Sequence, residues 1–102
     1  MTQFPNMQAR AAAILDRLID DGARLAASQP WRIGKIIRGE AVWPSVEDGE
    51  IVTVEDDLAL CRRLLADERE RHQAGHWTRD FNRLTALRQA EAALIILRGE
   101  DV

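Results

Sequence analysis

Three side chains that commonly bind metals follow one another at a spacing of four residues: Glu68, His72 and His76. On one continuous helix this spacing places all three on the same face, as zinc sites require. Gly75, however, is expected to end the helix before His76, and this would turn the second imidazole away from the other two. The sequence therefore predicts no metal site, only a polar helix end that carries histidines.

The single cysteine, Cys61, is the other candidate for chemistry. Along one helix it would lie three turns from His72, roughly 16 Å away and beyond hydrogen-bond reach. Its neighbours are leucines, and a small buried thiol is common in such surroundings. The chain also lacks a glycine-rich phosphate loop, a nucleophile elbow and a dinucleotide fingerprint. We therefore expect no catalytic residues, no cofactor and no enzymatic activity.

The length and composition limit the elements that could position any site. A chain of 102 residues that is 46% hydrophobic and 30% charged is typical of one soluble domain, here residues 1–102. Its apolar runs are far shorter than the roughly 20 residues that span a bilayer, so we expect no membrane partner. The N-terminus shows no pattern of a secretory signal and there is only one cysteine, so we expect a cytoplasmic location.

The first element predicted is a long helix over about residues 6–28. Its apolar residues recur at helical spacing and form one stripe: Met7, Ala11, Ile14, Leu18 and Leu25. Pro5 suits a helix start, and Pro30 marks the stop. The stripe is regular enough to pair with a second copy, so homodimer formation stays open.

Two further helices are predicted in the second half of the chain. The first of them covers about residues 54–74, with Thr53 as its cap, acids in its first turn and Gly75 at its end. The second covers about residues 79–98 and is expected to stop at Gly99. Because the turn between them is short, we expect an antiparallel helix hairpin.

Between these helical regions, residues 31–54 are rich in β-branched and aromatic side chains. Asp48-Gly49 is a strong hairpin signal. We expect an antiparallel meander with strands near 33–38, 41–46 and 50–54; a two-stranded ribbon with an irregular loop fits nearly as well. The predicted class is α+β and helix-rich: a long N-terminal helix, a small antiparallel β-meander or hairpin, and a C-terminal antiparallel helix hairpin.

Charge is segregated along the chain. Residues 22–39 contain four basic and no acidic side chains, whereas residues 40–57 contain seven acidic and no basic ones, although the net charge is only −3. Three of the acids suit the first turn of the helix that follows. One interpretation is that Lys35 and Arg38 pair with acids across neighbouring strands. The other is that the acids form a surface that attracts a basic partner.

The functional prediction follows from this acidic segment. We expect a small interaction or regulatory protein that binds another protein through residues of the β segment: Glu40, Trp43, Glu47, Asp48 and Glu50. Trp43 is interpreted either as packing the β segment onto the helices or as an exposed binding anchor.

Two alternatives stay open. The first is a phage- or mobile-element-encoded inhibitor, which the segregated acidic charge permits. Such an anti-CRISPR-like protein would mimic nucleic-acid charge in a basic groove. The second alternative is a small DNA-binding transcriptional regulator that uses Arg32, Lys35 and Arg38. Direct nucleic-acid binding is disfavoured, because the neighbouring acids repel phosphate.

Overall fold

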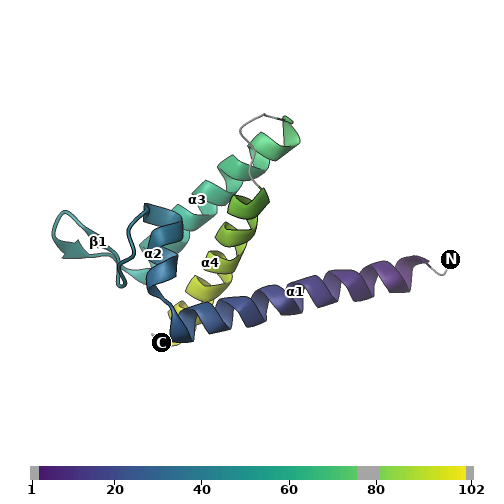
Figure 1. The fold of residues 1–102 in the computed structure, drawn as a ribbon, viewed down its shortest axis with the longest axis horizontal. Helices are drawn as coiled ribbons and strands as arrows, with labels where there is room; N and C mark the ends of the chain where they lie inside the picture. The colour runs from purple at the N-terminus through teal and green to yellow at the C-terminus, as the bar shows by residue number, and fades with distance from the viewer. Residues whose placement is uncertain (1–2, 76–80, 101–102) are drawn as a thin grey trace.

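The computed structural model describes residues 3–75 and 81–100, and it describes side chains from Asp16 to Gly75 and from Asn82 to Gly99. Its elements follow the order α1 (Gln3–Ser28), α2 (Trp31–Arg38), β1 (Val46–Glu47), β2 (Glu50–Ile51), α3 (Val54–Gln73) and α4 (Phe81–Glu100). The helix-rich α+β class is therefore confirmed, and so are the long first helix and the antiparallel pairing of the last two helices (Figure 1).

The helices α3 and α4 form the centre of the molecule. Both α1 and α2 pack against α4, and α2 also contacts α3. The buried apolar residues come from all four helices: Leu25, Ala26, Ile33, Ile37, Leu58, Cys61, Leu65, Leu87, Ala90, Ala93 and Leu94. Leu84 and Leu97 of α4 are half-buried and pack against this core.

The strand predicted over residues 33–38 is wrong, because this segment forms α2. Its isoleucines stand three and four residues apart, at positions 33, 36 and 37, so a helix buries them together on one face. Gly39 ends the helix with φ 79° and donates its N–H to the carbonyl of Lys35. Periodicity has outweighed the β-propensity of the residue types.

The strands predicted over 41–46 and 50–54 are reduced to two residues each, so the alternative of a short ribbon with an irregular loop is confirmed. The loop after α2 packs directly on the helix at Gly34. A Cβ at this position would lie 2.3 Å from the carbonyl oxygen of Val42. Only glycine permits this approach.

Helix boundaries agree with the sequence at α3 and at the end of α1, Ser28, whereas α1 begins at Gln3 and not near residue 6. Thr53 caps α3 through its hydroxyl, which accepts the Asp56 N–H at 3.2 Å, and Gly75 follows the helix with φ 65°. The stop predicted at Gly99 is wrong, since α4 continues to Glu100. A glycine inside a helix costs only about 1 kcal/mol relative to alanine and does not by itself end it. Predicted residues 79–80 lie outside the described residues.

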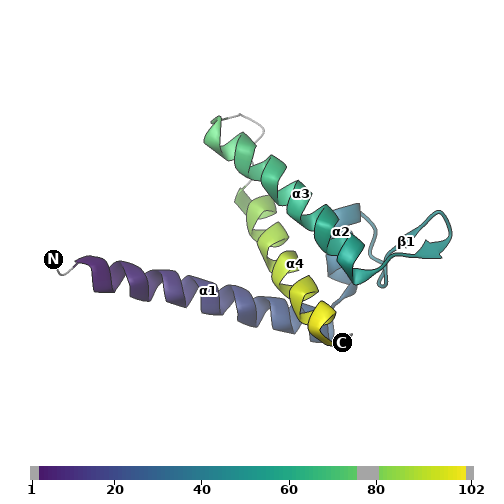
Figure 2. The same ribbon diagram turned by 180° about the vertical axis from the view of Figure 1, so that it is seen from behind.

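The crossing of α1 and α4 depends on small residues. A methyl group at Gly22 would lie 2.6 Å from the Ala92 Cβ and 3.0 Å from the Ala93 nitrogen. The two backbones therefore approach more closely than any larger side chain would allow. From this crossing the N-terminal half of α1 extends away from the other helices, as both views show (Figures 1 and 2). None of the described helices is long and apolar enough to cross a membrane.

Candidate functional site

The candidate site is built on the hairpin of β1 and β2. Asp48 and Gly49 both have positive φ values, 53° and 82°, which is the backbone of a two-residue hairpin turn. The register places Val46 opposite Ile51 and Glu47 opposite Glu50. Since neighbouring residues in a strand point to opposite faces, the apolar pair and the acidic pair lie on different faces of the hairpin.

Both pairs are exposed. Ile51 exposes 72% of its surface and Val46 exposes 47%, although both are large hydrophobic residues. Glu47, Asp48 and Glu50 are also exposed, so three acids surround the turn. Figure 1 shows that the hairpin projects from the helical body near the end of α2. Like charges directly opposite each other in a hairpin are destabilising. Glu47 pairs with Arg38, so Glu50 is the acid of this pair for which the described side chains record no ion pair.

Arg38 connects the hairpin to the helices. Its Nε donates to Asp57 Oδ1 at 2.9 Å and its Nη1 donates to Glu47 Oε2 at 3.3 Å. Burial alone would lower the pKa of this guanidinium, but its hydrogen bonds and ion pairs with Asp57 and Glu47 outweigh burial and raise the pKa. The interpretation that basic residues pair with nearby acids therefore holds for Arg38 and Glu47. Arg38 lies at the end of a helix, however, and not in a neighbouring strand.

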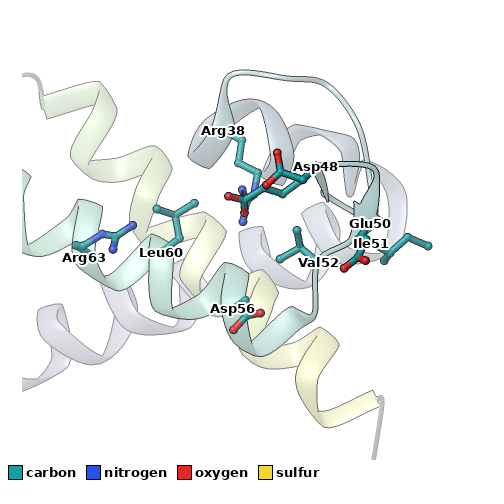
Figure 3. A pocket seen from close by; sticks show the side chains of 9 residues that line it. Arg38, Asp48, Glu50, Ile51, Val52, Asp56, Leu60 and Arg63 are labelled. Carbon is teal, nitrogen blue, oxygen red and sulfur yellow. Dashed lines mark hydrogen bonds and ion pairs between the residues drawn. The ribbon is translucent and has the colours of Figure 1, made fainter.

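A hollow of about 460 Å³ separates the hairpin from α3. Figure 3 shows Asp48 and Glu50 on its hairpin side, with Leu60 and Arg63 on α3. Asp56 in the first turn of α3 also lines it. Across the described side chains, the structure records no ion pair for Glu40, Asp48, Glu50, Asp56 or Arg63. The acidic charge of the hollow is thus only partly neutralised within the chain.

The remaining predicted binding residues are more dispersed. Glu40 is exposed in the loop after α2. Trp43 is half-buried and packs against the core, so of its two interpretations the packing role is the one observed. It also lines a second hollow, together with Ile51 and Leu97. The exposed apolar side chain of the hairpin is Ile51, and not Trp43.

The basic residues of α2 do not act as one set. Arg32 and Lys35 are exposed, and Arg32 donates to Gln29 Oε1 at 3.1 Å. Arg38 is committed to Asp57 and Glu47. Of the trio predicted for nucleic acid, only Arg32 and Lys35 are therefore exposed and without a recorded ion pair among the described side chains.

Sequence reasoning missed two buried polar residues beneath the hairpin. Asp57 was placed in the first turn of α3, but its side chain is fully buried and its Oδ2 has no hydrogen-bond partner. Ser45 is also buried, and its Oγ has none either. No local pattern shows this, because the partner of Asp57 lies 19 residues earlier in the chain. The pairing of Ile51 with Val46 could have been found, since the Asp-Gly turn fixes the register.

The residues that suggested chemistry lie elsewhere in the fold. Cys61 is buried, its thiol donates to the Leu87 carbonyl at 3.4 Å, and burial raises its pKa to about 12. Glu68 is buried near the end of α3, where it accepts a hydrogen bond from Arg71 and lies 3.5 Å from His72 Nε2. His76 lies outside the described residues. At neutral pH the thiol is protonated, so it is not a nucleophile.

No family model, no curated protein and no solved structure matches this chain. The fold and the geometry of the hairpin are therefore the basis for inferring function.

Proposed function

We propose that the chain is a small non-enzymatic protein that binds a basic surface of another protein through its acidic hairpin surface, defined as Glu40, Glu47, Asp48 and Glu50. The observation that carries this proposal is the Glu47–Glu50 pair, two exposed acids directly opposite each other on a projecting hairpin. Glu47 already pairs with Arg38, so the charge that a cationic group of a partner would neutralise is that of Glu50, together with its repulsion of Glu47.

The other face of the hairpin supports the same proposal. Ile51 and Val46 expose apolar surface that the chain itself does not cover. Interfaces combine apolar anchors with a charged rim, and the hairpin offers both within six residues. Trp43 lines a hollow next to Ile51. Its side chain would therefore enlarge the apolar contact, with Ile51 as the anchor.

The chemistry of the partner follows from the charge. A lysine- or arginine-rich surface fits, and the groove of a nucleic-acid-binding protein is one such surface. In that case the chain is an inhibitor that competes with nucleic acid, as the phage-encoded alternative requires. Direct DNA binding through Arg32 and Lys35 would instead bring phosphates close to the acidic hairpin, where they are repelled.

The test is a double charge reversal, Asp48→Lys with Glu50→Lys, which leaves Glu47 on Arg38. The matched control is Asp67→Lys with Glu70→Lys, which makes the same change in net charge at two exposed positions of α3. Affinity capture from cells of the source organism should recover a basic partner with the parent chain and the control, and lose it with the hairpin variant. Thermal melting of the control should stay close to that of the parent, and the hairpin variant should melt only slightly lower, because lysine adopts the positive φ of Asp48 less readily than aspartate.

Kinetics provide a second readout on the captured partner. The association rate should fall as salt is added, because steering by exposed charges is screened. A partner that still binds the hairpin variant would contradict the acidic-surface proposal. Retention of the parent chain on DNA, lost with Arg32→Ala and Lys35→Ala, would favour the regulator instead.

A further inference from the structure

The chain exposes more surface than its mass predicts. Its accessible surface is 7374 Å², whereas a compact monomer of 11.5 kDa is expected to expose about 5,800 Å². The excess is therefore about 1,600 Å². Its Cα radius of gyration is 15.3 Å, against about 13 Å for a compact domain of this length. This excess is thus comparable to the total surface that a standard protein–protein interface buries.

The N-terminal half of α1 projects from the packed helices (Figures 1 and 2). We call residues 3–15 the overhang, because α1 continues over them after the other helices have turned away (Figure 2). In the sequence, Met7, Ala11 and Ile14 continue the stripe of Leu18 and Leu25, and Leu25 is buried at the end of α1 that packs on the core. A helix of about 13 residues is marginal in water without an apolar face to pack against.

A groove lies where the overhang begins. It has a volume of about 550 Å³ and is lined by residues of α1, α3 and α4: Leu18, Ile19, Arg69, Arg88, Glu91, Ala92, Ile95 and Ile96. Five of these eight lining residues are apolar, and the other three are charged. Ile19 and Ile95 expose 48% and 40% of their surface there, although both are large apolar residues.

We propose that two copies of the chain form a two-fold dimer in which the overhang of each copy packs into the groove of the other. The two are complementary in kind: the sequence of the overhang carries apolar residues at helical spacing, and most of the residues that line the groove are apolar. They adjoin each other on one chain, so a two-fold axis satisfies both at once and closes the assembly. A standard interface removes about 800 Å² from each partner, which the excess surface readily supplies.

This dimer does not depend on the proposed function. The hairpin lies at the opposite end of the molecule from the overhang (Figure 1), so the acidic surface stays free in both copies. The partner is identified as a second copy because the one chain carries both complementary surfaces.

The first test is the mass in solution. Sedimentation velocity at increasing micromolar concentrations should give twice the 11.5 kDa chain mass. Ile19→Glu with Ile95→Glu should raise the dimer dissociation constant at least a hundredfold. The matched control is Ile51→Glu, an apolar-to-charged change at the exposed hairpin, which should leave the dimer intact. Far-ultraviolet circular dichroism verifies that each variant is folded.

The second test places the overhang in the groove without weakening the interface. One chain carries Met7→Cys and the other carries Ile95→Cys, and a short bis-maleimide is added to the mixture. Cys61 should not react, because it is buried and its pKa is about 12. The mixture should give a cross-linked pair of the two different chains, whereas Met7→Cys mixed with Ile51→Cys should not.

Three results would overturn the dimer. One is a single-chain mass at every concentration, and another is a dimer that survives the double glutamate variant. The third is cross-linking of Met7→Cys to the hairpin position in preference to the groove position.

Discussion

Two regions of the molecule are held against the α3–α4 core by different means. At one end, α1 crosses α4 at Gly22, which packs directly against Ala92 and the adjoining backbone. This contact depends on close steric packing. At the other end, the hairpin is connected through Arg38, which bonds both Asp57 and Glu47. We therefore expect a larger side chain at the helix crossing to destabilise the first region. Removing a charged partner from the Arg38 contacts should destabilise the second.

The largest effect is expected at the charged end. Arg38→Met leaves the fully buried carboxylate of Asp57 without its cation, and breaking a buried pair in this way costs about 3–5 kcal/mol. Urea denaturation should show this loss in the free energy of unfolding. The control Lys35→Met removes an exposed charge from the same helix and should change stability by less than about 0.5 kcal/mol. Equal effects of the two variants would show that the buried pair is not what holds this end.

The close helix crossing should give the next largest effect. Gly22→Ala places a methyl group 2.6 Å from Ala92 Cβ, so the helices must separate. Overpacking of this kind costs about 1–3 kcal/mol. Gly99→Ala is the matched control, because its Cβ would meet nothing and alanine favours the helix, so it should be neutral or slightly stabilising. If Gly22→Ala were as harmless as its control, the crossing would be looser than its geometry indicates.

The sequence predicts the helices well where one face is apolar and a cap marks the end. Thr53 and Gly75 bracket α3 as expected, because both act on the backbone within a few residues. Residues 33–38 were misassigned because residue type and spacing disagreed there, and burial decided in favour of spacing. A segment of eight residues offers too few turns for its periodicity to stand out.

The sequence predicted where the acids of the candidate site lie. It did not predict the buried residue Asp57, which binds Arg38 beneath them. The Asp-Gly turn is a local signal, so the positions of Glu47, Asp48 and Glu50 followed from the sequence. The burial of Asp57 did not, because it depends on Arg38 arriving from another helix. Contacts between distant segments leave no trace in local spacing, and the groove beside α1 was missed for the same reason.

Cys61, in the core between the two ends, gives a pH-dependent effect. Burial raises its pKa to about 12 from the ordinary 9.0. Between these values the unfolded chain loses the thiol proton and the folded chain keeps it, so stability falls as pH rises from about 9 to 12. The expected slope is about 1.4 kcal/mol per pH unit.

The background for this measurement is low, since the chain has no tyrosine and only one lysine, Lys35. Urea denaturation at pH 8, 9 and 10 should show the decline for the parent chain. Cys61→Ala should be less stable than the parent at pH 8, where the thiol is mostly protonated in both states, and the difference should narrow as the pH rises because the variant lacks the titrating thiol. An unchanged slope in this variant would mean that another group titrates.

The smallest effects are expected at the hairpin, and their signs differ. Glu50→Gln removes the repulsion across the Glu47–Glu50 pair and should stabilise the chain by a few tenths of a kcal/mol. Glu47→Gln removes the same repulsion but also weakens the bond to Arg38, so it should be neutral or slightly destabilising. Denaturation midpoints of the two variants, compared with the double variant, separate the repulsion from the Arg38 contribution.

The sign of the Glu50 effect bears on function. If Glu50→Gln is more stable but binds the partner more weakly, Glu50 lowers stability and contributes to binding, as residues at functional sites often do. If Glu50→Gln is less stable, the carboxylate has a local structural role and the acidic pair no longer argues for a binding surface. Measuring stability and capture on this one variant therefore tests the step from hairpin geometry to protein binding.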